Sequence, residues 1–273
     1  MFITDLDGTL FRSDHRFSDK DLEMLSTLGE MGVIRVLATG RSLFSLQRSV
    51  TFSLPVDYLI VSTGLGIMPY PNGQHHMMRT DGLNSEETAE IAALFMDLSL
   101  DFMIHQPLPD NHVFAYRCPS SNNPDFFTRI GFYENHCRVL DGNPGSFGAA
   151  SQFISMIPGP SGPEIYHLLR DKLKEFNVIK TTSPFDGKTM WLEVFPKNVS
   201  KGNAALWLAE KLQVEQANIV AVGNDYNDED LLEKAGKAYI VANGPEDLKR
   251  RFTVVASNNS EGVSEAARSA FDM

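Results

Sequence analysis

The chain has few cysteines, no long apolar stretch and no repeated or low-complexity segment. Its 273 residues include only two cysteines, Cys118 and Cys137, which form no CxxC pair and no disulfide framework. Such sparse cysteine usage suits a reducing compartment. No apolar run approaches the roughly 18 residues of a membrane-spanning helix, and the N-terminus leads into a strand rather than a secretory signal. We therefore expect a cytoplasmic protein without a membrane anchor.

Positive charge is also scarce. The chain has 24 lysines and arginines against 35 aspartates and glutamates, a formal net charge of −11. Binding to nucleic acid or to an anionic membrane surface relies on summed positive potential, so the charge argues against both partners. A small anionic substrate would need local positive charge at its site.

The first ten residues contain the most informative pattern, an apolar run that ends in Asp5-Leu6-Asp7-Gly8. On an extended chain, residues i and i+2 project to the same side, so Asp5 and Asp7 are expected to converge where the strand ends. Two converging carboxylates repel each other unless a cation or a shared proton separates them. A hard dication such as Mg²⁺ would relieve this repulsion and leave one carboxylate as a nucleophile.

Alternating strands and helices predict the fold class. A helical apolar stripe follows Ser18, and Gly32 is placed to end that helix. Further strands are expected at 33–38, 58–61, 218–222 and 238–242, each ending in polar or glycine residues. This pattern predicts an α/β protein with a Rossmann-like, doubly wound parallel sheet. Ligands bind beyond the carboxyl ends of such strands, so these ends are expected to form one site.

The middle of the chain has a different composition, rich in phenylalanine, histidine and proline. We interpret 82–184 as an inserted, smaller α+β domain, and 1–81 with 185–273 as the core. Helices are expected near 85–98 and 163–176, and strands near 101–106, 112–116 and 153–157. Residues 190–195 are expected to lead back into the core. At 273 residues and 42% hydrophobic content, two domains are compatible with the length.

Four separated pieces occur in a fixed order: Asp5-Leu6-Asp7-Gly8-Thr9, Thr39-Gly40-Arg41, Lys201-Gly202 and Gly223-Asn224-Asp225-Tyr226-Asn227-Asp228. Together they resemble the haloacid dehalogenase (HAD) superfamily of phosphotransferases. The large insertion after the second piece resembles the Cof-type sugar-phosphatase branch, which carries a C2-type α/β cap there. The resemblance covers the core by motif and the cap only by position and length.

This resemblance implies roles for the core residues. Asp5 is the nucleophile that forms an aspartyl-phosphate, and Asp7 is the general acid and base. The residues implied at the phosphoryl group are Thr39, Gly40, Arg41 and Lys201. The implied metal ligands are Asp5, Asp7, Asn224, Asp225 and Asp228, with Asn227 beside the metal and Lys201.

The fourth piece departs from the family pattern, which usually reads Gly-Asp-x-x-Asn-Asp with the first aspartate on the metal. Asn224 stands at that position and brings no charge, so we expect weaker metal binding unless Asp225 or Asp228 compensates. Thr63 stands near the place where the family commonly has an Asn-Gly pair, and its hydroxyl is a further candidate near the phosphate.

Simpler structural readings exist for each piece taken alone. Asp5 and Asp7 could form a turn and cap, because aspartate is common in turns. Lys201 follows Ser200, a possible N-cap, and could be a solvated lysine in the first turn of a helix. The ordered set of four pieces favours the catalytic reading over these.

The sequence therefore predicts a Mg²⁺-dependent phosphatase for a small phosphorylated metabolite, with a sugar phosphate as the leading substrate class. One alternative is a phosphomutase of the same superfamily. Another is a catalytically weakened phosphosugar-binding protein, because Asn224 removes a charge from the metal site. The sequence carries no motif for the exact substrate or for an oligomeric state.

Overall fold

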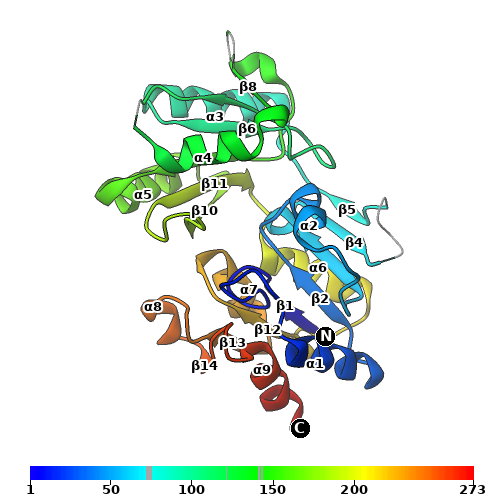
Figure 1. The fold of residues 1–273 in the computed structure, drawn as a ribbon. Coiled ribbons are helices and arrows are strands. Elements are labelled where there is room, and N and C mark those ends of the chain that lie inside the picture. The colour runs from blue at the N-terminus through cyan, green and yellow to red at the C-terminus, as the bar shows by residue number, and fades with distance from the viewer. Residues whose placement is uncertain (72–75, 121, 141, 143) are drawn as a thin grey trace. The chain divides into compact units, whose positions relative to one another are not determined.

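The computed structural model describes residues 1–71, 76–120, 122–140, 142 and 144–273, which form two compact units (Figure 1). Unit 1 comprises Met1–Thr80 with Ser200–Met273, and unit 2 comprises Asp81–Val199. None of the helices in these described ranges is long and apolar enough to cross a membrane.

Unit 1 contains an eight-stranded sheet in the order β14-β13-β12-β1-β2-β3-β4-β5. The six strands from β14 to β3 are parallel, and β4 and β5 add an antiparallel edge. The strands are β1 (Phe2–Thr4), β2 (Arg35–Ala38), β3 (Tyr58–Val61), β4 (Gly66–Pro69), β5 (Arg79–Thr80), β12 (Val220–Gly223), β13 (Lys237–Val241) and β14 (Thr253–Val255).

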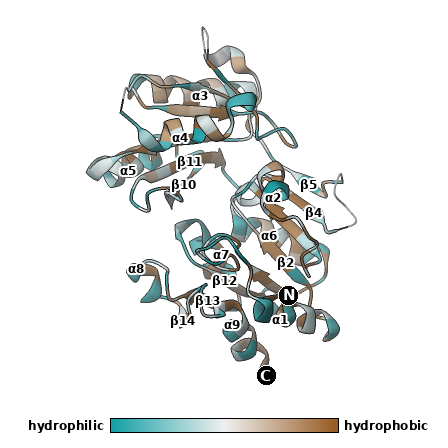
Figure 2. Ribbon diagram, viewed as in Figure 1, coloured by the Kyte–Doolittle hydropathy of each residue, from teal (hydrophilic) through white to brown (hydrophobic). Residues whose placement is uncertain are grey.

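Helices cover both faces of this sheet because both faces are apolar, as the brown strands in Figure 2 show. One face packs against α6 and α7 in a core that includes Ile3, Ala38 and Leu208. On the other face, Phe2 contacts Phe271 of α9. The helices are α1 (Asp19–Glu30), α2 (Leu43–Ser49), α6 (Lys201–Lys211), α7 (Glu229–Lys234), α8 (Glu246–Lys249) and α9 (Gly262–Phe271), with the short 3₁₀ turns η1 (Ser62–Gly64) and η6 (Tyr226–Asp228).

The strand order reverses at β1. The polypeptide runs outward from β1 to β2 and β3 on one side, and later from β12 to β13 and β14 on the other. In doubly wound sheets the loops on either side of such a reversal diverge and leave a binding crevice at the carboxyl ends of the strands. The expected α/β, doubly wound fold class is confirmed, and its reversal lies directly beneath Asp5.

Unit 2 contains a six-stranded sheet in the order β10-β11-β9-β6-β7-β8. All neighbouring strands are antiparallel except β7 and β8. Helices α3 and α5 pack on one face, and α4 packs on the other. The elements are α3 (Ser85–Asp97), β6 (Phe102–His105), β7 (Phe114–Arg117), α4 (Pro124–Phe132), β8 (Cys137–Val139), β9 (Phe153–Ile157), α5 (Gly162–Lys172), β10 (Phe176–Thr182) and β11 (Met190–Pro196).

For the inserted segment, the expected return to the core, the expected boundaries and the expected end of one helix were wrong. Residues 190–195 do not return to the core, because β11 pairs with β9 and β10 in the sheet of unit 2. The second boundary therefore lies at 199/200 rather than at 184/185, while the first lies at 80/81 rather than at 81/82. The helix expected to reach residue 176 ends at Lys172, because Phe176 is a buried strand residue opposite Pro196.

Gly64 brings the turn after β3 against the start of α6. Its φ of +106° is a backbone conformation that side-chain-bearing residues rarely adopt. A Cβ atom at this position would lie 2.4 Å from the carbonyl oxygen of Ser200, the residue before Lys201. Only glycine permits this close approach, which places the N-terminus of α6 beside the strand ends.

Replacing Gly64 by alanine is expected to lower the free energy of unfolding by roughly 2–5 kcal/mol, since it adds backbone strain to a steric clash. Urea denaturation measures this loss. The control is Gly32→Ala, at φ +77° with no atom within 4 Å of an added Cβ. It should lose only the free energy of unfolding that corresponds to backbone strain, about 1–2 kcal/mol. Equal losses in the two variants would contradict the proposed steric contact.

Candidate active site

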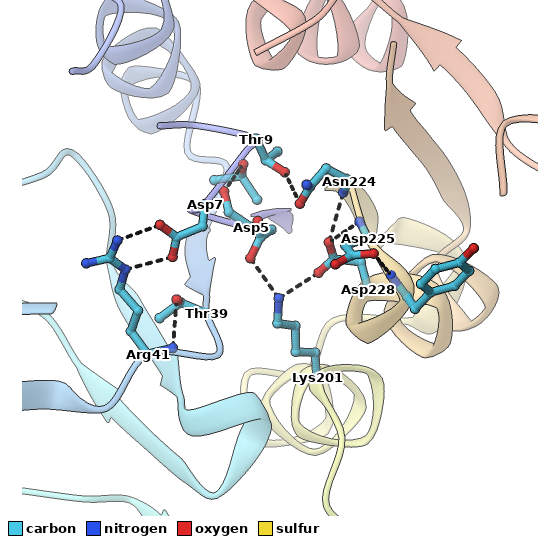
Figure 3. A network of polar contacts seen from close by, with 11 residues as sticks. Asp5, Asp7, Thr9, Thr39, Arg41, Lys201, Asn224, Asp225 and Asp228 are labelled. Carbon is cyan, nitrogen blue, oxygen red and sulfur yellow. Dashed lines mark hydrogen bonds and ion pairs between the residues drawn. The ribbon is translucent and has the colours of Figure 1, made fainter. Parts of the chain in front are cut away.

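The strand ends of unit 1 bring the four sequence pieces together (Figure 3). Asp5 follows β1 and Thr39 follows β2, while Asn224 follows β12. Lys201 is the first residue of α6, where the Ser200 hydroxyl accepts a hydrogen bond from the Asn203 backbone N–H at 3.0 Å. The expected Ser200 N-cap is therefore present, and the four pieces form one polar network.

Lys201 is the centre of this network. Its Nζ lies 2.7 Å from Asp5 Oδ1 and 2.7 Å from Asp228 Oδ1, and its side chain has no exposed surface. A buried ammonium group is tolerated only with close anionic partners, and here it has two. The reading of Lys201 as a solvated first-turn lysine is excluded by its burial.

Burial and charge shift the pKa values in this cluster. Burial, together with the neighbouring charges of Asp228 and Asp7, raises the pKa of Asp5 to about 7, although Lys201 acts against the rise. For Lys201, burial favours the neutral form, but Asp228 and Asp5 outweigh it and raise the pKa above its ordinary value. Lys201 is therefore a permanent cation, whereas Asp5 needs more positive charge to be fully ionised at neutral pH.

Asp228 shapes the loop that follows β12. Its Oδ2 accepts hydrogen bonds from the backbone N–H groups of Asn224 at 2.8 Å and Asp225 at 3.2 Å. A Cβ on Gly223 would lie 2.5 Å from the Cβ of Asp228, so the glycine is required for this fold-back. Both carboxylate oxygens of Asp228 are thus already used within the protein, one on Lys201 and one on the loop.

Asp225 caps the short turn that it opens. Its Oδ1 accepts a hydrogen bond from the backbone N–H of Tyr226 at 2.8 Å, and its backbone N–H donates to Asp228. The carboxylate contributes negative charge close to the site, while one of its oxygens serves the backbone.

Asp7 and Arg41 form a bidentate ion pair. The Arg41 Nε and Nη2 atoms lie 2.7 Å and 2.6 Å from the two carboxylate oxygens of Asp7, whose side chain is 44% exposed. A planar guanidinium holds a carboxylate in a defined orientation through two parallel hydrogen bonds. In this structure Arg41, which the resemblance implies at the phosphoryl group, lies against the expected acid and base instead.

Small polar groups line the end of β2. Thr39 is buried, and its Oγ1 accepts a hydrogen bond from the Arg41 backbone N–H at 3.1 Å. A Cβ on Gly40 would lie 3.5 Å from both Asn227 Nδ2 and Thr63 Oγ1. The Thr63 hydroxyl is buried without a partner among the described residues, and Thr63 has a strained φ of +59°. It is thus a stronger candidate than its sequence context indicated, because strained backbone and unpartnered groups gather at functional sites.

The Asn224 amide lies among oxygen atoms of the first loop. In one orientation its Oδ1 accepts a hydrogen bond from Thr9 Oγ1 at 3.2 Å. In the other, its Nδ2 donates to Asp5 Oδ2 at 3.2 Å, to the Asp7 carbonyl oxygen at 2.9 Å and to Thr9 Oγ1 at 3.2 Å. Thr9, which sequence reasoning passed over, is fully buried and completes this cluster. Its position in the Asp7-Gly8-Thr9 turn, directly after the two aspartates, was the signal that could have identified it as a site residue.

These oxygen atoms are suited to bind a hard cation with modest affinity. The oxygen atoms of Asp5, Asp7 and Thr9 lie 2.9–3.2 Å from the Asn224 side-chain amide atom that faces them. This spacing is close to the separation of about 3 Å between neighbouring ligand atoms of octahedral Mg²⁺. Only one of them, Asp5 Oδ2, belongs to a carboxylate. Across the described part of the chain, no group of three or more histidine, cysteine or acidic side chains is arranged to hold a metal. The donor set therefore suits Mg²⁺ but carries little charge.

The sequence matches a known protein family over nearly its whole length. A model of haloacid dehalogenase-like hydrolases matches residues 2–266. The chain belongs to this family. The expected HAD superfamily, its Cof-type branch and the class of phosphatase enzyme are all confirmed.

Curated and solved relatives of the HAD family cover nearly the whole chain. The 5-amino-6-(5-phospho-D-ribitylamino)uracil phosphatase YwtE of Bacillus subtilis is 24% identical over 94% of this chain and 92% of its own. The structure of the phosphatase BT1666 from Bacteroides thetaiotaomicron superposes with a TM-score of 0.78 at 17% identity, covering 100% of this chain and 95% of that one. The HAD subclass IIB sugar phosphatase BT4131 gives a TM-score of 0.74 at 16% identity, covering 98% and 97%.

The raised pKa of Asp5 predicts a pH-dependent stability for this HAD enzyme in the presence of a chelator. Because the folded pKa of about 7 exceeds the ordinary value of 3.8, the contribution of Asp5 is complete only below about pH 4 and is lost as the pH rises through 7. Asp5→Asn keeps an oxygen for Lys201 and stays neutral. Its melting temperature is expected to exceed that of the wild type by more at about pH 8 than at about pH 5.

The control for this experiment is Asp57→Asn in the same unit. Burial favours a higher pKa for Asp57, but hydrogen bonds from Arg35 outweigh it and lower the pKa. Asp57 therefore stabilises the fold above about pH 4, and its replacement should lower the melting temperature at about pH 8. The same sign in both variants would contradict the assignment of Asp5.

Asn224→Asp is expected to make stability depend on Mg²⁺. The ion pairs of the site join three carboxylates (Asp5, Asp7 and Asp228) to two cations (Lys201 and Arg41), and Asp225 adds negative charge nearby, so a carboxylate at position 224 would face Asp5 uncompensated. In chelator the variant should melt below the wild type. Added Mg²⁺ should raise its melting temperature further than that of the wild type, consistent with about tenfold or greater tightening of metal binding.

Asp225→Asn is the matched control for the metal experiment. It preserves the oxygen that accepts from Tyr226, so the loop is retained while one nearby charge is removed. If Asn224→Asp responds to Mg²⁺ no more than the wild type does, residue 224 is not at the metal.

Proposed function

We propose that this HAD enzyme is a Mg²⁺-dependent phosphatase that hydrolyses a small sugar or sugar-alcohol phosphate through an aspartyl-phosphate intermediate. One observation carries the proposal: the fully buried Lys201 joins Asp5 to Asp228 at the strand reversal. A cation at this position orients the nucleophile and offers positive charge to a bound phosphoryl group.

The similar proteins support the substrate class. One curated relative is named for the phosphate ester of a ribityl compound, and one structural neighbour is named a sugar phosphatase. Both are phosphatases of small polyhydroxylated molecules. We also propose that unit 2 is the cap that determines which of these molecules is accepted, as the position of the insertion in the HAD family implies.

The proposed reaction has two steps. The Asp5 carboxylate attacks phosphorus, the bond from phosphorus to the ester oxygen breaks, and Asp7 donates a proton to the leaving alkoxide. Asp7 then removes a proton from a water molecule, which attacks phosphorus and breaks the bond to Asp5, releasing inorganic phosphate. Through its bidentate contact Arg41 orients the ionised Asp7 carboxylate, the form that accepts the proton of the water molecule.

Positive and dipolar groups stabilise the phosphoryl oxygens in both steps. Lys201, the Thr39 hydroxyl and the backbone at Gly40 and Arg41 are the protein groups assigned to this role, and Thr63 adds a hydroxyl beside Gly40. The Asp5 carboxylate, the backbone carbonyl oxygen of Asp7 and the side-chain carbonyl oxygen of Asn224 would hold Mg²⁺. Its charge would keep Asp5 ionised and neutralise the phosphoryl group. Asp225 and Asp228 act around this site through the backbone and Lys201.

A phosphate-release screen with Mg²⁺ over sugar phosphates, sugar-alcohol phosphates, nucleotides and phosphoglycolate-like acids tests the proposal. We expect turnover of at least one polyol phosphate and a loss of about 10³-fold or more in Asp5→Asn. With p-nitrophenyl phosphate, whose leaving group needs little protonation, Asp7→Asn should release one equivalent of nitrophenol per protein in a burst and then turn over slowly.

The other outcomes separate the alternatives. Isomeric phosphate esters without phosphate release would identify a phosphomutase. Binding of phosphosugars without turnover under any divalent metal would identify a phosphosugar-binding protein and would sink the phosphatase proposal. A burst that persists in Asp5→Asn would remove that residue from the role of nucleophile.

A further inference from the structure

A second polar cluster lies in unit 2, away from every residue assigned to the phosphatase chemistry. His105, Gln152 and Glu193 come from three neighbouring strands or their ends, β6, β9 and β11, and each is at least 93% buried. By the alternation of strand side chains, they share the sheet face of Met103 and Ile154, which is the face that α4 covers. The cluster therefore lies under α4.

Two hydrogen-bond acceptors in this cluster have no partner among the described residues. His105 Nδ1 lies 2.7 Å from the carbonyl oxygen of Asn111, to which it donates, and burial lowers the pKa of His105 to about 3. The ring is thus neutral, and its buried Nε2 is an acceptor. Gln152 Oε1 is also buried and unpartnered, while the Gln152 Nε2 donates to Glu193 at 3.4 Å.

Arg129 of α4 supplies an unpartnered donor. Its guanidinium lies over the rings of Tyr133 and Trp191, with Cζ 5.2 Å and 5.3 Å from their centroids. The Nε atom is buried and, within the described ranges, meets no acceptor. Arg129 is near enough to contribute to the lowered pKa of His105. The residue as a whole is half-buried, so the cluster reaches the surface at this side chain.

Two exposed aromatic rings connect to Arg129 through the ring of Trp191, which is itself buried. Trp191 contacts Phe185 with ring centroids 5.4 Å apart, and Phe185 contacts Phe132 at 5.6 Å. Phe132 is 63% exposed and Phe185 is 41% exposed, which is unusual for adjacent large apolar side chains. We call these three residues the aromatic rim. An exposed aromatic surface next to buried polar groups suits a ligand with both an apolar face and hydroxyl groups.

We propose that unit 2 contains a binding site for an uncharged cyclic polyol, with the ring on the aromatic rim and its hydroxyl groups on Arg129, His105 and Gln152. Each hydroxyl group donates one hydrogen bond and can accept others, so a ligand with several hydroxyl groups can serve one unpartnered donor and two unpartnered acceptors of the cluster. Burial lowers the pKa of Arg129 although the Glu193 carboxylate acts against this, so the cluster already holds a negative charge and a neutral ligand fits better than an anion. Leaving such buried groups unpaired is unfavourable, and a ligand that pairs them relieves this cost.

This proposal uses residues of unit 2 alone and does not depend on phosphatase activity. The protein has only two tryptophans, so Trp207→Phe leaves Trp191 as the single indole reporter at the aromatic rim. In this background, titration with D-glucose, ribitol and myo-inositol is followed by tryptophan fluorescence. We expect a saturable change at millimolar concentrations for at least one of the two cyclic compounds and weaker binding of the acyclic ribitol.

Three variants with matched controls test the contacts. Arg129→Met and Gln152→Leu should each weaken binding about tenfold, and Phe132→Ala about threefold or more. Arg170→Met removes an arginine of the same unit that stacks on Tyr166, and Phe127→Ala removes an exposed phenylalanine from the same helix as Phe132. Neither control should change the affinity. Far-ultraviolet circular dichroism verifies that Arg129→Met and Gln152→Leu are folded. If these two variants do not fold, the comparison of Phe132→Ala with Phe127→Ala still decides the test.

Asp5→Asn should bind the polyol as the wild type does, so failure of the phosphatase proposal leaves this test intact. The proposal is overturned if no cyclic polyol gives a saturable fluorescence change, which would assign the unpaired atoms to buried water only. Equal weakening by Phe132→Ala and Phe127→Ala would also overturn it.

Discussion

The contact on which the active site depends is the buried salt bridge of Lys201 with Asp5 and Asp228. An ammonium group without exposed surface is stable only because two carboxylates lie 2.7 Å away, and each carboxylate comes from a different element. The bridge thus joins the start of α6 to the end of β1 and to the turn η6 that follows β12. Glycines make the approach possible, because Gly64 contacts Ser200 and Gly223 contacts Asp228 at distances that exclude a Cβ. The same contacts therefore keep Lys201 charged in the interior and orient the nucleophile.

The charges around this salt bridge determine how strongly the site can bind a metal ion and a phosphorylated substrate. In the ion pairs of the site three carboxylates face two cations, and Asn224 leaves the proposed metal position without the carboxylate that the HAD motif implies there. The amide satisfies the nearby oxygens by itself when its nitrogen faces them, so the protein alone has little need of a cation there. Binding of Mg²⁺ and of a phosphate dianion should then favour each other, since each supplies charge that the other needs and such coupling is reciprocal.

Unit 2 differs from unit 1 in how it manages its polar groups. At the strand ends of unit 1 the buried charges of Lys201, Asp5 and Asp228 pair with one another, whereas under α4 a neutral histidine, a glutamine and an arginine keep hydrogen-bonding atoms without partners among the described residues. Helices α3 and α5 cover one face of its sheet with apolar contacts, while α4 is short and leaves aromatic rings exposed at its end. The two faces are thus suited to different purposes, one to stability and one to recognition.

The sequence by itself indicated β1, β2, β3, β12 and β13 of the sheet in unit 1 and the order of the motifs that follow them, but it gave no indication of β4, β5 and β14. Strands that are buried on both faces and end in polar residues carry a local signal, and the spacing of Asp5 and Asp7 follows from the two-residue period of a strand. Only the tertiary structure placed β11 in unit 2, paired Arg41 with Asp7 and buried Lys201. Those features depend on partners far apart in the sequence, such as the 196 residues between Lys201 and Asp5. No local pattern specifies which strand edge or which carboxylate a residue will meet, because that choice is made by packing.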